Sequence, residues 1–276
     1  MFDATADANS KAFSVGRAFF GVATTASGVM QLVTWDFVRL VPQWPAWVPA
    51  RSMWACAIGA ILVVAGLAML LGRTARTAGA VVGAMLLVMV LALCLPQLVA
   101  HPSIERAYLR GFMWTNPLKA LALSGGAALI SGRRREVPRV LLAAFLVVCG
   151  LQHFAYNDFV TALVPSWIPA QRFWAYFTGV ALIGGGAGLL VPRATRLAAT
   201  LSAGMVFLWV LLLHIPRAIA GPRHAFETAG VFEALALSAV ALMLSVAQPV
   251  CNPLEAPGRG SAPSDTPPGP TIPKRS

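Results

Sequence analysis

Charged residues are scarce in this sequence: they make up 11% of its 276 residues, whereas soluble domains carry about 25%. Reactive motifs are scarce as well, because the four cysteines form no C-x-x-C pair. A disulfide framework and a thiol-redox centre are therefore not expected. The sequence also contains no zinc motif, no nucleophile elbow and no phosphate-binding G-K-[ST] loop. These absences exclude a soluble hydrolase or kinase, and they leave no catalytic motif and no metal site to assign.

Apolar residues, in contrast, make up 58% of the chain, and the mean hydropathy is +0.72. A helix crosses a membrane core of about 30 Å with about 20 mostly apolar residues. The apolar runs are continuous rather than alternating, which argues against a transmembrane barrel. We therefore expect an all-α, polytopic membrane helix bundle with eight transmembrane helices. The eight windows are 13–33, 53–71, 78–98, 113–131, 139–157, 173–191, 197–215 and 229–247.

The distribution of basic residues predicts the orientation. If the N-terminus lies inside, thirteen Lys and Arg residues fall in the inner segments and seven in the outer ones, as the positive-inside rule requires. No basic residue precedes Lys11, so no cleavable signal peptide is expected. We predict a multi-pass protein of the bacterial inner membrane, surrounded by the lipid bilayer, with both termini cytoplasmic. Because the net charge of +11 is spread over many loops, a nucleic-acid partner is not expected.

The sequence contains an internal repeat with an offset near 120 residues. Residues 28–102 align with 150–222, and the string ALALS at 120–124 recurs at 234–238. Each copy holds four predicted spans, so the two copies enter the membrane from the same side, which is a parallel duplication. The predicted segments are an N-terminal cytoplasmic segment (1–12), a first four-helix unit (13–131), a basic linker (132–138), a second four-helix unit (139–247) and a disordered, Pro-rich cytoplasmic tail (248–276).

The second copy carries a set of short motifs: GLQHF at 150–154, VPSWIP at 164–169, WAYFTG at 174–179 and GAGLL at 186–190. In this pattern the chain resembles the DoxX-like family of four-helix bacterial membrane proteins, over roughly residues 140–245. The first copy is a degenerate version. It has Gln31, Cys56 and Ile58 at the places of His153, Tyr176 and Thr178, respectively.

The resemblance implies a membrane location and a four-helix unit. The family takes its name from a subunit linked to a thiosulfate:quinone oxidoreductase, so it also implies a redox- or quinone-associated subunit, with membrane or redox protein partners. The family supplies no agreed catalytic motif, and no catalytic residue can be carried over to this chain.

Two histidines, His153 and His214, are expected near the outer ends of the fifth and seventh spans, at similar depth. Two imidazoles on facing helices can ligate a haem iron or hydrogen-bond a quinone. The alternative is that each is a buried histidine satisfied by a neighbour. Asp158 either caps the turn that follows it or joins His153, and Tyr176 belongs to the same candidate polar site.

Lys119 and Glu233 occupy equivalent positions in the two copies, at the outer ends of the fourth and eighth spans. An ionisable residue within a span is costly and is usually paired or lines a cavity. Opposite charges at equivalent positions predict an intramembrane ion pair across the pseudo-twofold axis. The alternative is that each side chain extends to the outer interface.

Two structural expectations concern the loops and the glycines. The outer loops 34–52 and 157–172 repeat Trp and Pro, which is typical of an interfacial aromatic belt with stiff turns. Gly184 and Gly188 form a G-x-x-x-G pair that lets helices approach closely.

Three classes of function remain open at this point. They are a redox-associated membrane subunit that handles quinone or electrons, a small-molecule transporter, and a non-catalytic accessory or scaffold protein.

Overall fold

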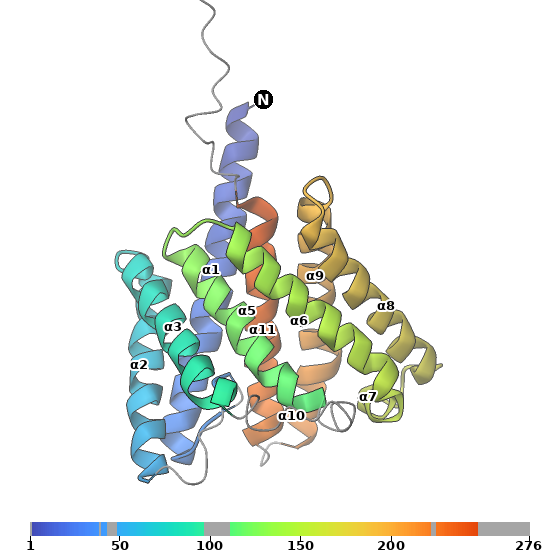
Figure 1. Ribbon diagram of the computed structural model, residues 1–276, viewed down its shortest axis with the longest axis horizontal. Helices are drawn as coiled ribbons and strands as arrows, with labels where there is room; N and C mark the ends of the chain where they lie inside the picture. Colours follow the sequence, from blue (N-terminus) through green and yellow to red (C-terminus); the bar gives the residue numbers. More distant parts are fainter. Residues whose placement is uncertain (1, 39, 43–48, 97–110, 222–224, 248–276) are drawn as a thin grey trace, which may run out of the picture.

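The computed structural model describes residues 2–38, 40–42, 49–96, 111–221 and 225–247, and these residues are helical with no strand (Figure 1). The segment 248–276, for which a disordered tail is predicted, lies outside the described residues, as do Trp44, Trp47 and Cys251. The elements are α1 (Phe2–Thr34), α2 (Arg51–Leu71), α3 (Ala75–Met89), η1 (Val90–Cys94), α5 (Gly111–Ile130), α6 (Glu136–Ala155), α7 (Asn157–Leu163), α8 (Gln171–Leu190), α9 (Thr195–Trp209), η3 (Val210–His214), α10 (Ile215–Ala220) and α11 (Ala225–Val246).

Six helical segments among the described residues are long and apolar enough to cross a membrane. They are Arg51–Leu71, Ala75–Cys94, Glu136–Ala155, Gln171–Leu190, Thr195–Ala220 and Glu227–Val246. The prediction of an all-helical, multi-pass membrane protein is thereby confirmed at this level. The other two predicted windows, 13–33 and 113–131, correspond to α1 and α5, which are not among the six.

The long helices form a closed ring of neighbours in two layers. One layer consists of α2, α1, α11 and α9, and the other of α3, α5, α6 and α8 (Figure 1). The layers join at both edges, where α2 packs on α3 and α8 packs on α9, and in the middle, where α11 packs on α5. The helices α5 and α11 therefore lie at the centre of the assembly.

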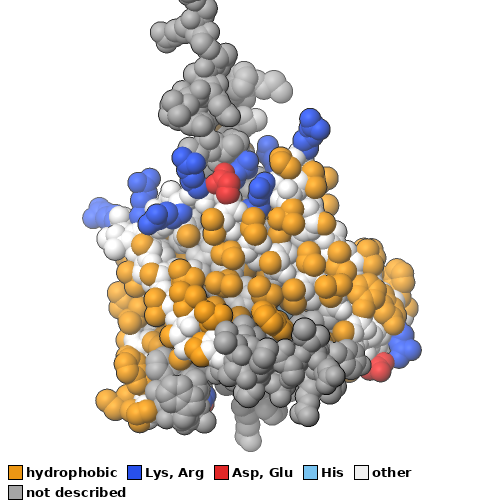
Figure 2. Space-filling model, viewed as in Figure 1, with side chains coloured by type: hydrophobic (Ala, Val, Ile, Leu, Met, Phe, Trp, Pro, Cys, Tyr) orange, Lys and Arg blue, Asp and Glu red, His pale blue; other side chains and the backbone are white. Residues whose placement is uncertain are grey.

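Large apolar side chains cover the outside of the bundle, as a protein in lipid requires. Leu71, Val33 and Met53 are 81%, 74% and 73% exposed, respectively. Figure 2 shows hydrophobic side chains over the middle of the visible face, with Lys and Arg gathered at the upper end. Such a large exposed apolar surface would cause aggregation in water, so it fits a bilayer environment.

Several local features recur at the repeat spacing. Two π-helical turns, η1 and η3, lie 120 residues apart, and each precedes a proline, Pro96 and Pro216, respectively. A proline has no N–H to donate and its ring clashes with the carbonyl four residues earlier, so a wider turn relieves the helix there. The residues that precede α2 and α8, Ala50 and Ala170, both adopt the left-handed conformation, with φ of 56° and 55°.

Equivalent side-chain hydrogen bonds also join neighbouring helices within each half of the chain. The Ser124 hydroxyl on α5 donates to the carbonyl of Gly83 at 2.8 Å, and the Ser238 hydroxyl on α11 donates to the carbonyl of Ala203 at 2.9 Å. Each bond joins a helix of the central pair to its neighbour within the same half of the chain.

Glycines set the closest helix approaches. A Cβ on Gly28 would lie 2.6 Å from the carbonyl oxygen of Gly59, and a Cβ on Gly150 would lie 2.7 Å from that of Gly179. The α1–α2 and α6–α8 pairs therefore depend on glycine at equivalent places. The expectation for Gly184 is wrong: a Cβ there would meet nothing within 4 Å, whereas one on Gly186 would clash with α6.

The second outer loop, 157–172, begins with a helix that was not predicted. Residues Asn157–Leu163 form the short helix α7 directly after α6. The backbone N–H of Val160 bonds to the carbonyl of Tyr156, and the Asn157 side chain donates to the carbonyl of His153, which continues helical bonding past the end of α6. The described tryptophans nearby, Trp167 and Trp174, are 64% and 41% exposed, as an interfacial belt requires.

Candidate functional site

The most unusual polar feature within the described residues is an ion pair inside the apolar bundle. Its residues lie well within α5 and α11 and not at the ends of these helices, where the sequence predicts them. Lys119 on α5 and Glu233 on α11 approach to 3.1 Å between Nζ and Oε2, and their side chains are only 4% and 15% exposed. The structure thus brings together the two charges at the centre of the assembly, where the two halves of the chain meet. A buried charge is costly without a partner, so each of these residues depends on the other.

An apolar layer lies two helical turns from this pair, toward the N-terminal end of α1. A Cβ on Gly126 would overlap the side chain of Val240 and lie 3.3 Å from the ring of Phe20, so α5, α11 and α1 meet at this level without space between them. Phe20 is 1% exposed and Val240 is fully buried. This Phe20 layer is solidly packed.

A polar level lies seven residues away from the Phe20 layer on all three helices. Because α1 runs antiparallel to α5 and α11, a shift of seven residues leads from Phe20 to Ser27, from Gly126 to Lys119 and from Val240 to Glu233. Seven residues are two helical turns, or about 10 Å. The register therefore places Ser27 at the level of the ion pair, on the side away from the N-terminal end of the bundle.

Two polar side chains of α1 at and beyond this level are buried without a protein partner. Ser27 is 1% exposed and Gln31 is fully buried, and neither the Ser27 hydroxyl nor either amide atom of Gln31 has a hydrogen-bond partner in the protein. Thr24, on the same face of α1, differs because its hydroxyl donates to the carbonyl of Phe20 at 2.7 Å. Orphaned buried polar atoms are rare in proteins and indicate water, a ligand or a functional role.

Further polar residues surround the pair on α5 and α6. The Lys119 ammonium donates to the Asn116 side-chain oxygen at 3.2 Å, one turn back along α5. The Thr115 hydroxyl donates to the Gln152 side chain at 2.9 Å, which ties α5 to α6. Pro117 lies between these residues inside α5, where it removes one helical N–H donor.

The two histidines do not form a paired ligand set. Nδ1 of His153 lies 2.8 Å from the carbonyl of Cys149, and its ring stacks on Trp209 with 6.3 Å between centroids. His214 lies beside α11, where a Cβ on Gly230 would be 3.1 Å from its Nδ1. The prediction of a shared haem or quinone site for the two imidazoles stays a prediction. The described residues also contain no group of three or more His, Cys, Asp or Glu that could hold a metal.

The remaining members of the candidate polar site point elsewhere. The Asp158 side chain is 91% exposed and bonds to Arg172 at 2.8 Å. Tyr176 packs against Phe154 with 5.6 Å between ring centroids and is 42% exposed. The four residues therefore do not assemble into one polar cluster.

The motifs that carry the family resemblance have a structural explanation in the α6–α8 pair. A Cβ on Gly179 would lie 2.9 Å from both His153 and Phe154. The glycine of the motif therefore leaves the space on α8 into which the His-Phe pair of α6 packs. The Thr178 hydroxyl donates to the carbonyl of Trp174 at 2.8 Å within α8. The Gln171 amide donates to the carbonyl of Val164 at 2.7 Å and anchors the loop that returns into α8.

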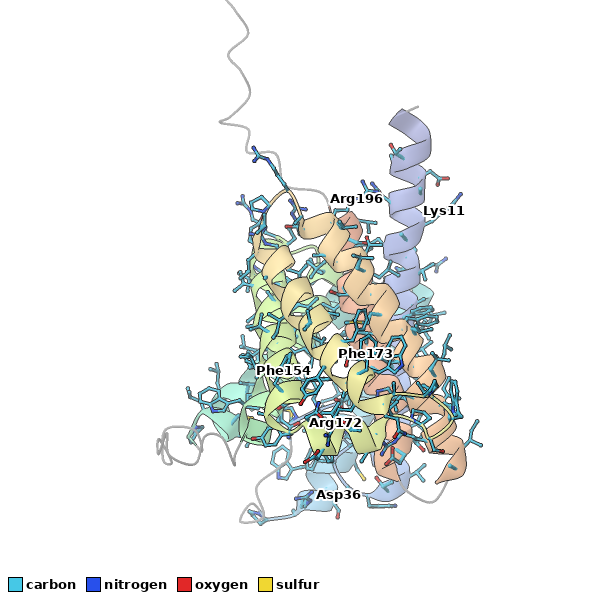
Figure 3. All side chains as sticks on the ribbon, turned by 90° about the vertical axis from the view of Figure 1, so that its right-hand side faces the viewer. Lys11, Asp36, Phe154, Arg172, Phe173 and Arg196 are labelled. Atoms are coloured by element: carbon cyan, nitrogen blue, oxygen red, sulfur yellow. The ribbon has the colours of Figure 1, made fainter. Side chains whose placement is uncertain are left out.

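The two ends of the bundle differ in charge pairing. At one end lie exposed arginines for which the structure has no ion pair among the described residues: Arg73, Arg76, Arg133, Arg134, Arg193 and Arg196. At the opposite end, each described arginine of the connecting segments is paired with an acid: Arg51 with Asp36, Arg172 with Asp158 and Arg217 with Glu227. Figure 3 shows Arg196 and Lys11 at one end and Asp36 and Arg172 at the other.

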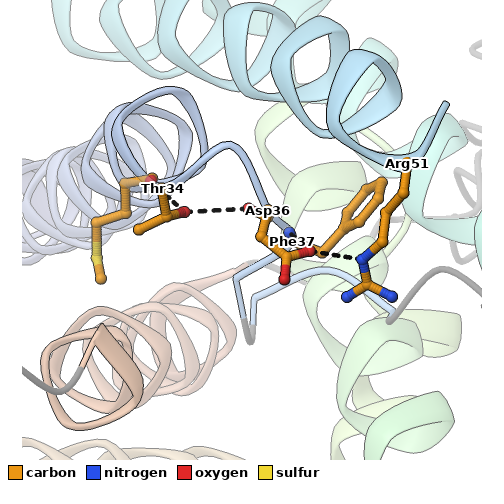
Figure 4. A network of polar contacts seen from close by, with 5 residues as sticks. Thr34, Asp36, Phe37 and Arg51 are labelled. Carbon is orange, nitrogen blue, oxygen red and sulfur yellow. Dashed lines mark hydrogen bonds and ion pairs between the residues drawn. The ribbon is translucent and has the colours of Figure 1, made fainter.

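The Asp36–Arg51 pair is an example from the end of the bundle where the described arginines are paired with acids (Figure 4). Arg51 Nε and the backbone N–H of Phe37 each donate to Oδ1 of Asp36 at 2.7 Å. Partial burial raises the pKa of Asp36, but the hydrogen bonds from Arg51 and Phe37 and the charge of Arg51 lower it below its usual value. Asp36 therefore stays ionised at neutral pH and neutralises Arg51.

Sequence reasoning missed Ser27 and Gln31 as members of the site. A signal was present, because Phe20, Thr24, Ser27 and Gln31 follow the spacing of one helix face. That spacing shows that three polar residues share a face, but only the packing of α1 on its neighbours α2 and α11 shows that the face is buried.

Comparison with known proteins adds a partial match. Residues 142–247 match the family model of a domain of unknown function (DUF8561). The matched stretch runs from within α6 to the end of α11. No curated protein and no solved structure matches the chain.

Proposed function

We propose that this chain is a small-molecule transporter of the inner membrane, built from two related DoxX-like four-helix units with eight spans and with both termini cytoplasmic. The recurrence of η1 and η3, of the left-handed Ala50 and Ala170, and of the serine bonds on α5 and α11 supports a duplication. The family match over 142–247 supports the second half as a unit. Transporters commonly combine such repeats with a site near the middle of the membrane, where the repeats meet.

The observation that carries the proposal is the Lys119–Glu233 pair. It joins α5 to α11, one helix from each half, where the two halves meet. Transporters built from repeats commonly bind their substrate between the repeats, which supports a substrate site here. Charged residues inside a membrane are costly and mark substrate or ion pathways. A pair that is neutral as a whole can separate when each charge finds a partner on the solute, and the two units can then move relative to each other.

Unequal charge at the two ends supports the orientation. Unpaired arginines gather at the end that holds the linker, and the Arg135 side chain donates to the carbonyl of Ala247 at 2.9 Å, which joins the linker to the end of α11. The positive-inside rule assigns this end to the cytoplasm.

Redox and scaffold roles have weaker support. The His-Phe and the glycine of the DoxX-like motif have an explanation in the packing of α6 on α8, without a cofactor. A Soret band or a stoichiometric quinone in the purified protein would favour the redox role. Stable co-purification of a membrane partner, without any uptake, would favour the scaffold role.

Transport can be tested with the purified full-length protein in liposomes. We expect uptake of at least one radiolabelled solute from a panel of amino acids, sugars, carboxylates and amines, above the rate in protein-free liposomes. The matched control is the double variant Lys119→Leu/Glu233→Leu, which removes the pair without leaving a lone charge and should lose uptake while remaining folded. No uptake of any solute by the wild type, or unchanged uptake by the folded double variant, would contradict the proposal.

A further inference from the structure

We infer that each half of the chain binds the phosphate group of an anionic phospholipid at a cluster of three arginines, at the end of the bundle that holds the linker. The two arginine clusters are Arg17, Arg73 and Arg76 in the first half, and Arg139, Arg193 and Arg196 in the second. They lie away from the Lys119–Glu233 pair, so lipid binding holds or fails independently of transport.

The members of the two clusters occupy equivalent places in the two copies. Arg17 on α1 and Arg139 on α6 have the same offset as Gly28 and Gly150, the glycines that set the equivalent helix approaches. The other members lie in the turns between α2 and α3 and between α8 and α9, or in the first turns of α3 and α9. The clusters are therefore one structural feature that is present once in each half.

In each half, the arginine of the first helix reaches the turn between the next two long helices. The Arg17 guanidinium lies beside Gly72 in the turn after α2, where a Cβ on Gly72 would be 3.1 Å from one of its nitrogens. The Arg139 guanidinium donates to the Thr195 hydroxyl, at the start of α9, at 3.4 Å. Because these turns carry the other arginines of the cluster, each half places three positive charges at one turn.

Acidic side chains do not neutralise these charges within the part of the chain that the structure describes. None of the six arginines forms an ion pair there, and the buried Nε of Arg139 has no hydrogen-bond partner in the protein. Asp7 is bound to Lys11 at 2.6 Å, and Glu136 in the first turn of α6 is exposed. Since a partly buried charge is stable only when it is paired or hydrogen-bonded, an anion from outside the protein completes the clusters.

Phosphate is the anion that such a cluster suits best. The planar guanidinium group matches the geometry of a phosphate and donates two parallel hydrogen bonds to it. Basic pockets between transmembrane helices bind phospholipid headgroups in this way.

Exposed apolar side chains next to the clusters favour a lipid over a soluble phosphate. Leu71 and Val15 are 81% and 45% exposed, and their equivalents Val191 and Val137 are 52% and 66% exposed. Each of these residues lies two positions before an arginine of its cluster. Figure 2 shows the basic side chains of this end directly above the hydrophobic side chains of the bundle. A phospholipid can therefore place its headgroup at the arginines while its acyl chains cover the apolar surface.

The positive-inside rule does not by itself account for the clusters. That rule concerns the number of basic residues in the connecting segments, and the exposed linker residues Arg133 and Arg134 satisfy it equally well. Arg17 and Arg139 differ from these residues because they lie within helices, are only partly exposed and contact a turn of their own half.

Native mass spectrometry of the purified full-length protein with phosphatidylglycerol counts the bound lipids. We expect two tightly held lipids on the wild type, one on Arg17→Gln or Arg139→Gln, and none on the double variant. The matched control is Arg133→Gln/Arg134→Gln, which removes the same charge from the same end and should keep both lipids. The variant Arg73→Gln/Arg193→Gln changes only exposed side chains, so it should stay folded, and it should also reduce lipid occupancy.

Thermal unfolding in detergent identifies the ligand. We expect phosphatidylglycerol to raise the unfolding temperature of the wild type by several degrees more than that of Arg17→Gln/Arg139→Gln, and inorganic phosphate to raise neither. A rise with inorganic phosphate equal to that with lipid would show a site for a soluble anion and overturn the lipid assignment. Equal lipid loss in the Arg133→Gln/Arg134→Gln control, or unchanged lipid binding by Arg73→Gln/Arg193→Gln or by the folded Arg17→Gln/Arg139→Gln, would also overturn it.

Discussion

Replacing Lys119 with leucine is expected to lower the free energy of unfolding by about 3–5 kcal/mol, because it leaves the Glu233 carboxylate charged and unpaired inside the bundle. A loss of this size is a large part of the total stability of a typical protein, about 5–15 kcal/mol. The Glu233→Leu variant should be damaged in the same way, because it leaves the ammonium alone. Thermal unfolding in detergent and the yield of monodisperse protein measure both effects.

The double variants separate pairing from independent roles. Lys119→Leu/Glu233→Leu should recover most of the stability, since apolar residues of similar size often replace a buried ion pair without loss. The reversal Lys119→Glu/Glu233→Lys should recover it in part. The Lys11–Asp7 pair is the matched control: it is 76% and 61% exposed, and Asp7→Asn should change stability by less than about 1 kcal/mol. Additive damage in the double variants would show that the two charges act independently.

Replacing Gly28 with alanine adds one methyl group at the contact between α1 and α2 and is expected to destabilise the protein strongly. The new Cβ would lie 2.6 Å from the carbonyl oxygen of Gly59 and 2.7 Å from the backbone nitrogen of Val63. Neither backbone atom can rotate away, so the helices must separate. Overpacking of this kind typically costs about 1–3 kcal/mol and occasionally more. Thermal unfolding of the purified variant measures the loss.

Gly204 provides the matched control for this substitution. It lies inside α9, and a Cβ there would meet nothing within 4 Å. Alanine is the better helix former by about 0.5–1 kcal/mol, so Gly204→Ala should be neutral or stabilising. Equal damage from the two substitutions would contradict the close α1–α2 approach.

Much of the helical framework could be predicted from hydropathy alone. The windows 53–71 and 173–191 lie within two residues of α2 and α8, because long apolar runs leave little choice between helix and other structure in lipid. The α7 helix could not be predicted in this way, because its helical bonding depends on how the chain leaves α6. The glycine contacts could not be predicted either, because spacing alone cannot distinguish Gly186, which packs against α6, from Gly184, which does not.

The candidate site could be predicted only in part, for a related reason. Lys119 and Glu233 could be linked because their equivalent positions and opposite charges indicate a common location. His153 and His214 could not be resolved, because similar depth in two helices does not determine which way each ring faces. Ser27 belongs to no motif and Gln31 only takes the place of His153 in the degenerate copy, so their burial without a protein partner becomes visible only in the structure.

The most direct test of the account is the membrane topology of the full-length chain, because the ion pair between two parallel units requires it. Reporter fusions or accessibility labelling can be placed in the linker 132–138, in the loop that contains Trp167 and after residue 247. The account predicts that the linker and the C-terminal segment lie on the cytoplasmic side and that Trp167 lies on the opposite side. A linker and a C-terminal segment on opposite sides of the membrane would contradict it.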